Sequence, residues 1–100
     1  MKALHAPIVA VHSPPREQIY GVLLADPERD WRMSQLAEQV PDVSVGDVRA
    51  ILYLLLGERL VEAVAHQRNL TLRLTDAGRA TVEQITARWQ RSPKTGEGAE

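Results

Sequence analysis

The side chains in this chain that could do chemistry are arginines, and they are unevenly spread. Residues 59–79 contain four arginines and two acidic residues, a local charge of +2. Residues 15–58 contain four arginines and eight acidic residues, a local charge of −4, and the whole chain carries −1. Basic side chains supply most of a protein's affinity for duplex DNA, which is a polyanion. The pattern indicates that residues 59–79 include a surface able to face DNA.

Other kinds of site have little support in the sequence. The chain has no cysteine, which excludes disulfides and cysteine-ligated zinc. The histidines His5, His12 and His66 are scattered singly, whereas a metal ion needs several converging ligands. No glycine-rich phosphate loop and no supported Ser/His/Asp set occurs, so we expect neither an enzyme nor a cofactor. No apolar run reaches the roughly 18–20 residues that cross a bilayer, so we expect a soluble cytoplasmic protein without a membrane partner.

Hydrophobic spacing and capping residues predict the elements that would position the arginines. We expect helices over residues 16–25, 34–40, 44–56 and 76–90, and two strands over 60–65 and 70–75 with a turn at 66–69. Ser13, Ser34 and Ser44 are the expected N-caps of the first three helices, and Asp47 follows Ser44 at capping-box spacing. The sequence therefore predicts a mainly α fold with a small β-hairpin.

The expected core follows the same periodicities. Trp31 lies in a charged connection and is expected to fill the core there. Leu52 falls on the apolar face of the third helix, together with Val48, Ile51 and Leu55. Leu70, Leu72 and Leu74 alternate with polar residues, so all three are expected to face inward.

The ends of the chain differ from its middle. Residues 1–14 are expected to form an N-terminal arm, in which the segment Ile8–Val11 has strand propensity. The arm is either a partly ordered tail or a segment packing on its own domain or on a second subunit. Residues 15–90 form the expected domain. Residues 91–100 are rich in Pro, Gly, Lys and Glu, which is typical of a disordered tail.

Four segments, in this order, carry a resemblance to a known class of proteins. They are Met33-Ser34-Gln35-Leu36-Ala37-Glu38, the helix led by Ser44, Glu58-Arg59-Leu60-Val61 and Leu74-Thr75-Asp76-Ala77-Gly78-Arg79. Over residues 16–89 the chain resembles the winged helix-turn-helix regulators of bacteria, especially the MarR-like and PadR-like families. The resemblance implies a three-helix core, a wing formed by the hairpin, and a C-terminal helix.

One departure from that pattern concerns the end of the third helix. Families of this kind commonly carry glycine where Arg59 stands, just before the wing. We expect Gly57 to end the helix instead, two residues earlier.

A helix-turn-helix places the second helix of the pair in the major groove. The expected DNA-binding residues come from the third helix, the hairpin and the start of the second helix: Arg32, Ser44, Gly46, Arg49, Tyr53, Gln67, Arg68, Asn69 and Arg73. Other interpretations stay open. Arg49 could be a solvated charge and Tyr53 a cover for the core, the hairpin tip could be an ordinary polar turn, and Arg32 could pair with Asp30 or Glu28.

The function expected from the resemblance is a transcriptional regulator, acting as a repressor on double-stranded DNA. A lone domain of this size covers one half-site, so we expect a homodimer. Val82, Ile85 and Trp89 of the last helix are its expected interface, unless they pack on the first helix instead. The alternative function is a winged-helix module for protein–protein interaction, favoured by the acidic first half and the apolar region around Leu54 and Leu56.

Overall fold

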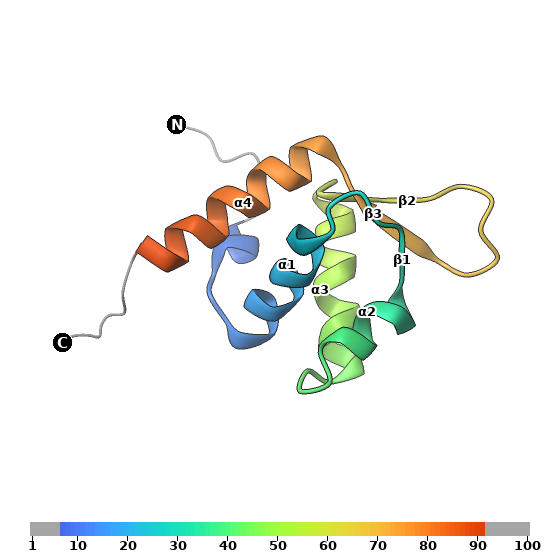
Figure 1. Ribbon diagram of the computed structural model, residues 1–100, viewed down its shortest axis with the longest axis horizontal. Coiled ribbons are helices and arrows are strands. Elements are labelled where there is room, and N and C mark those ends of the chain that lie inside the picture. The colour runs from blue at the N-terminus through green and yellow to red at the C-terminus, as the bar shows by residue number, and fades with distance from the viewer. Residues whose placement is uncertain (1–6, 92–100) are drawn as a thin grey trace.

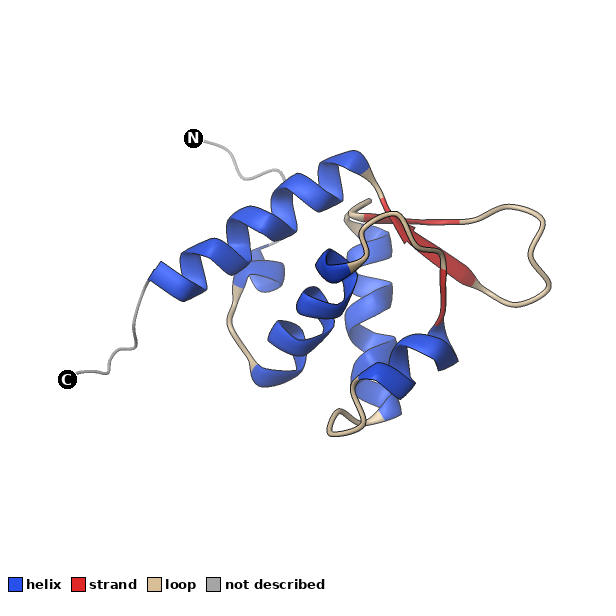
Figure 2. Ribbon diagram, in the orientation of Figure 1, coloured by secondary structure: helices blue, strands red, loops and turns tan. Residues whose placement is uncertain are grey.

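The computed structural model describes residues 7–91 as a mainly helical molecule with a small three-stranded antiparallel sheet (Figures 1 and 2). Its elements are the 3-10 helix η1 (Pro7–Ala10), α1 (Pro14–Ala25), β1 (Trp31–Arg32), α2 (Met33–Gln39), α3 (Val45–Gly57), β2 (Val61–Ala63), β3 (Thr71–Leu74) and α4 (Asp76–Arg91). The mainly α class with a β-hairpin is confirmed. Residues 1–6 of the expected arm and 92–100 of the expected tail lie outside the described residues.

The long axis of the molecule separates its two most extended parts. The β2–β3 hairpin projects from the helices at one end, and the C-terminal part of α4 extends at the other (Figure 1). Helix α1 packs against α2, α3 and α4, and β2 packs on α3. The core therefore lies where α1, α3 and the sheet meet, and the hairpin tip stands apart from it.

Two of the three expected helix caps are confirmed. Ser13 Oγ accepts a hydrogen bond from the Arg16 backbone N–H (3.2 Å), and Ser44 Oγ accepts one from the Asp47 backbone N–H (3.0 Å). The prediction that Ser34 caps the second helix is wrong, because α2 already begins at Met33. There the Gln35 side chain accepts a hydrogen bond from the Arg32 backbone N–H (3.0 Å), so the cap comes from inside the helix.

The sheet contains a strand that the sequence did not predict. Strand β1 pairs antiparallel with β3, Trp31 opposite Leu72 and Arg32 opposite Thr71, which gives the order β1-β3-β2. A strand of two residues is too short to show an alternating pattern. Trp31 is buried, as predicted, and this pairing ties the start of α2 to the base of the hairpin.

The buried residues follow the predicted periodicities with one exception. Leu52 is 1% exposed, and Val48, Ile51 and Leu55 are buried beside it on α3. Leu72 and Leu74 face inward as predicted. The prediction that Leu70 is buried is wrong. This side chain is 39% exposed, because β3 begins only at Thr71 and Leu70 lies in the hairpin loop.

Helix α3 ends in a Schellman motif that uses an arginine. The Leu60 N–H donates to the Leu55 carbonyl (2.9 Å), and the Arg59 N–H donates to the Leu56 carbonyl (3.1 Å). Arg59 takes the left-handed conformation, φ 62°, that such a motif needs. The expectation that Gly57 replaces the missing glycine is therefore wrong, since Gly57 is the last helical residue and Arg59 makes the turn.

The start of α4 is fastened to the residue that follows this turn. The Leu60 carbonyl accepts a hydrogen bond from the Thr75 N–H (3.1 Å), and the Thr75 hydroxyl donates to the Arg59 carbonyl (2.9 Å). Thr75 Oγ1 also accepts from the Gly78 N–H (2.8 Å), which caps α4. A Cβ atom on Gly78 would lie 1.7 Å from the Leu60 carbonyl oxygen, so only glycine fits at this crossing.

The N-terminal segment packs on its own domain. Tyr20 donates its hydroxyl hydrogen to the Val9 carbonyl (2.8 Å), and Trp89 Nε1–H donates to the Ala10 carbonyl (3.0 Å). Val9 is fully buried. Of the alternatives for the arm, packing on its own domain is confirmed from residue 7 onward. The strand propensity of this segment gave the wrong structure, because η1 forms there instead.

The three residues expected at a dimer interface take part in this packing. Val82 and Ile85 are 0% and 4% exposed within the single chain. Trp89 stacks on Tyr20, with ring centroids 5.5 Å apart, and is partly buried. Packing within the chain therefore leaves almost no surface of Val82 or Ile85 for a second copy, whereas Trp89 keeps part of its surface exposed.

Candidate nucleic-acid interface

Four of the expected DNA-contacting side chains come together around one shallow hollow of about 210 Å³. They come from three elements: the start of α2, the outer side of α3 and the hairpin loop. The lining residues are Arg32, Met33, Ser34, Arg49, Tyr53, Asn69 and Leu70. Met33, Ser34 and Leu70 were not predicted to lie in the site. For Leu70 the alternation with Leu72 and Leu74 pointed inward instead.

The local structure explains why these side chains meet. Arg49 and Tyr53 lie one turn apart on α3, on the side opposite the buried Ile51 and Leu55. Arg32 immediately precedes α2 and is paired with Thr71 across the sheet. This pairing holds the start of α2 beside the hairpin, so that the hairpin loop lies next to the outer side of α3.

A second hollow of about 360 Å³ continues this surface to the hairpin tip. Its lining residues are Asp30, Arg32, Gln35, Gln67, Arg68, Asn69 and Thr71. Arg32 and Asn69 line both hollows, so the surface is continuous from α3 to the tip. We call the residues lining the two hollows the open face. It includes six of the nine expected DNA-binding residues.

The cations of the open face lack acidic partners. Within residues 7–91, no ion pair or side-chain hydrogen bond of Arg32, Arg49 or Arg68 occurs. The interpretation of Arg32 as a partner of Asp30 is not seen, because the Asp30 carboxylate lies 3.6 Å from the guanidinium of Arg73. Three positive charges on this surface therefore remain available to an anionic ligand.

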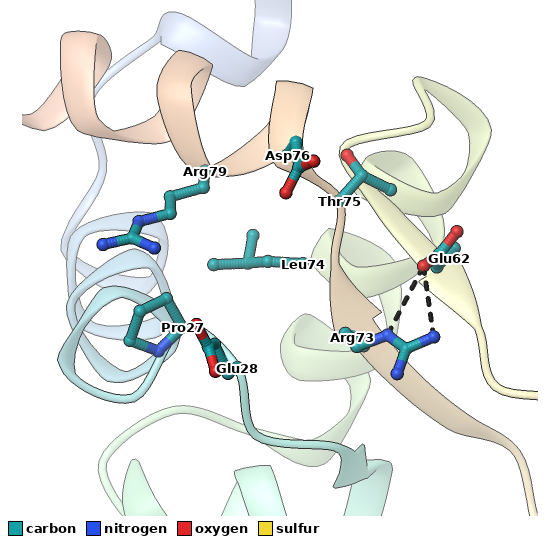
Figure 3. Close-up of a pocket in the computed structure, with 8 residues that line it drawn as sticks. All are labelled: Pro27, Glu28, Glu62, Arg73, Leu74, Thr75, Asp76 and Arg79. Carbon is teal, nitrogen blue, oxygen red and sulfur yellow. Dashed lines mark hydrogen bonds and ion pairs between the residues drawn. The ribbon is translucent and has the colours of Figure 1, made fainter.

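Arg73 differs from these three arginines. Its guanidinium lies between two carboxylates, 3.4 Å from Glu62 and 3.6 Å from Asp30. It lines a different hollow, of about 490 Å³, with Pro27, Glu28, Glu62, Leu74, Thr75, Asp76 and Arg79 (Figure 3). Figure 3 shows its contacts with Glu62 as dashed lines. The charge of Arg73 is thus balanced within the protein, and the structure does not bring this residue to the open face.

Ser44 and Gly46 also lie away from the open face. Both are exposed at the N-terminal end of α3, where the Ser44 side chain serves as the helix cap. Neither lines the two hollows. The positive charge of α3 is therefore that of Arg49 in its second turn, beside the hairpin, whereas the first turn carries the acidic residue Asp47.

The group with a strongly shifted pKa lies elsewhere in the molecule. Burial raises the pKa of Tyr20 to about 12, against a smaller lowering by the positive charge of Arg16. This phenol hydrogen-bonds the Val9 carbonyl in the core. Its shift therefore reflects packing and gives no sign of a catalytic group.

Metal-binding and membrane-spanning features do not occur in the described part of the chain. Residues 7–91 contain no group of three or more His, Cys, Asp or Glu side chains placed to hold a metal ion. Among the same residues, no helix combines the length and apolar character needed to cross a membrane. Comparison with known proteins adds no assignment: no family model, curated protein or solved structure matches this chain.

Proposed function

We propose that this chain is a winged helix-turn-helix protein that binds double-stranded DNA and regulates transcription, with repression as its action. One observation carries the proposal: Arg32, Arg49 and Arg68 come from three elements, share one continuous surface and have no acidic partner within the described residues. Unpaired guanidinium groups gathered in this way suit a polyanion, because they form strong, charge-assisted hydrogen bonds with phosphate oxygens.

The element arrangement supports a specific docking. Helices α2 and α3 are joined by a short turn, and α3 presents Arg49 and Tyr53 outward while its other side fills the core. In the proposed complex α3 enters the major groove, and the hairpin carries Arg68 to the phosphates of the neighbouring backbone. Arg32, at the start of α2, contacts a phosphate.

The proposal includes a homodimer, because one such domain covers a single half-site. The contact between copies lies outside Val82 and Ile85, which are buried within each chain. Light scattering on the wild-type protein, alone and with a duplex, tests this part: a second copy is expected at least on the DNA. A single copy under both conditions contradicts the dimer and leaves the DNA proposal standing.

The DNA proposal is tested by fluorescence anisotropy on a random-sequence duplex over a range of salt concentrations. Arg32→Ala, Arg49→Ala and Arg68→Ala are measured beside Arg88→Ala, which removes the same charge from α4, away from the open face. For each arginine that meets a phosphate, we expect weaker binding and a salt slope smaller by about one unit. Arg88→Ala is expected to bind as the wild type does.

Two results would contradict the proposal. One is a wild-type protein that binds no duplex even at low salt. The other is an Arg88→Ala variant that loses as much affinity as the three open-face variants, because the attraction would then depend only on total charge.

A protein-binding module is the second candidate function. Tyr53 and Leu70 are 50% and 39% exposed in the same hollow, and exposed aromatic and aliphatic side chains beside arginine are typical of protein interfaces. The anisotropy experiment separates the two candidates, because a protein-binding module would show no salt-dependent affinity for a duplex.

A further inference from the structure

The apolar part of the open face is unusual for a surface that meets a polyanion. Tyr53 and Leu70 are 50% and 39% exposed, and they line the 210 Å³ hollow together with Arg49 and Asn69. Phosphate contacts by the arginines leave these two side chains uncovered. An exposed apolar pair inside a DNA-binding surface gains free energy only if the DNA offers an apolar group to cover it.

The major groove offers one such group. The C5-methyl of thymine is the apolar feature of the base edges there, and the pairing adenine presents N6–H₂ and N7, which an asparagine amide can bond together. Residues of both complementary kinds line the hollow: the exposed Tyr53 and Leu70, and Asn69, whose side chain is an amide. Of the four base-pair orientations, those with adenine and thymine match this combination.

We infer that this hollow recognises an A·T base pair through the thymine methyl group, which Tyr53 and Leu70 cover, while Asn69 bonds the adenine. This inference rests on the proposed DNA-binding function and deepens it. Arg49, one turn before Tyr53 on α3, is placed to bond a neighbouring guanine or phosphate. Tyr53 and Leu70 therefore set sequence preference, whereas Arg32 and Arg68 set affinity for any duplex.

The test uses duplexes selected for binding from a pool with a randomised core. Each thymidine of the best duplex is replaced in turn by deoxyuridine, which lacks only the methyl group. Burial of one methyl group is equivalent to about fourfold in affinity, so we expect a loss of about fourfold at the contacted thymidine of each half-site and no loss at the others.

Protein variants connect this loss to the two side chains. Tyr53→Ser and Leu70→Ser are expected to bind thymidine and deoxyuridine duplexes equally, so that the ratio of the two affinities falls from about four to one. Tyr53→Phe keeps the ring and should keep the discrimination. Val11→Ser is the matched control, because Val11 is also 50% exposed but belongs to the N-terminal segment. Circular dichroism verifies that each variant is folded.

The outcomes separate this inference from the proposed function. A wild-type protein that binds duplexes but does not distinguish deoxyuridine from thymidine at any position overturns the thymine inference alone. So does a Tyr53→Ser or Leu70→Ser variant that keeps the discrimination. A protein that binds no duplex overturns the DNA-binding function, and the inference falls with it.

Discussion

The two sides of this molecule differ in whether their polar side chains have partners within the chain. On one side η1, α1, the end of α3 and α4 meet, and we call this the closed side. There the phenol of Tyr20 and the indole N–H of Trp89 reach the carbonyls of Val9 and Ala10. On the open face, Arg32, Arg49 and Arg68 have no acidic partner within residues 7–91. We therefore expect changes on the closed side to affect stability, and changes on the open face to affect the proposed binding.

The comparison has a physical basis. A buried donor or acceptor without a partner costs about 1–3 kcal/mol, so hydrogen bonds within the chain matter most on the closed side. An exposed guanidinium is satisfied by water and can exchange that water for a ligand at little cost. Changes on the two sides should consequently move different measurements: the free energy of unfolding on the closed side, and affinity on the open face.

The largest expected effect on stability is at Gly78. In Gly78→Ala the new Cβ would overlap the Leu60 carbonyl, which also accepts a hydrogen bond from the Thr75 N–H. We expect a loss of about 3 kcal/mol or more in the free energy of unfolding, measured by urea denaturation. Gly21→Ala is the control: a Cβ there meets nothing within 4 Å, and alanine should stabilise α1 by about 1 kcal/mol. Equal tolerance of both changes would contradict the tight crossing.

The next effect appears as a dependence on pH. Tyr20 has a folded pKa of about 12, above the ordinary value of 10.0, because burial disfavours the phenolate. A raised pKa means that the stabilisation is complete below pH 10 and is lost as the pH rises towards 12. We expect the free energy of unfolding to fall by about 2–3 kcal/mol over that range.

The Tyr20→Phe variant isolates this contribution. It should lose about 1 kcal/mol at neutral pH with the hydrogen bond to Val9, and it should show a smaller fall at alkaline pH. An unchanged fall in the variant would assign the alkaline loss to other groups. Tyr53→Phe, on the open face, is expected to leave the stability at neutral pH as it is.

A stabilising change is expected at the end of α3. Arg59 holds a left-handed conformation that costs a residue with a Cβ about 1–2 kcal/mol, and glycine adopts it freely. After allowing for the greater unfolded-state entropy of glycine, Arg59→Gly should raise the free energy of unfolding by about 1 kcal/mol. Glu58→Gly, one residue earlier at φ −90°, should lower it. A destabilised Arg59→Gly variant would show that the arginine side chain stabilises the junction.

The smallest effects on stability are expected on the open face. Arg49→Ala and Arg68→Ala remove exposed side chains without partners in the described chain, so the free energy of unfolding should change by less than about 0.5 kcal/mol. Thermal unfolding measured by circular dichroism checks this. A larger loss from either change would break the division between the two sides, because the open face would then contribute to stability.

Prediction from sequence succeeded where a side chain acts on its own neighbours. Ser13 and Ser44 cap their helices through residues three positions away, and the spacing of Leu52 among its apolar neighbours shows its burial. It failed where the partner is distant in sequence. Strand β1 forms through pairing of Trp31 with Leu72, 41 positions further along the chain. The left-handed turn at Arg59 places the Leu60 carbonyl where it accepts a hydrogen bond from the Thr75 N–H. No local pattern contains those distances.

The candidate site divides along the same line. The local excess of arginine indicates the hairpin with Arg68 and Asn69, and the resemblance to helix-turn-helix proteins indicates Arg32, Arg49 and Tyr53. The tertiary structure decided that these five share one surface, whereas Arg73 is held by Asp30 and Glu62.

The sequence by itself determined the helices, most of their caps, the hairpin and the charge that the chain can offer. Those features depend on periods of two or 3.6 residues and on interactions within one helical turn, which involve only residues close together in the sequence. Only the tertiary structure decided which charges stay free and which apolar side chains stay exposed. Val82 and Ile85 are buried in the core and Leu70 is exposed, because packing between segments distant in sequence determines which side chains stay accessible to water or a ligand.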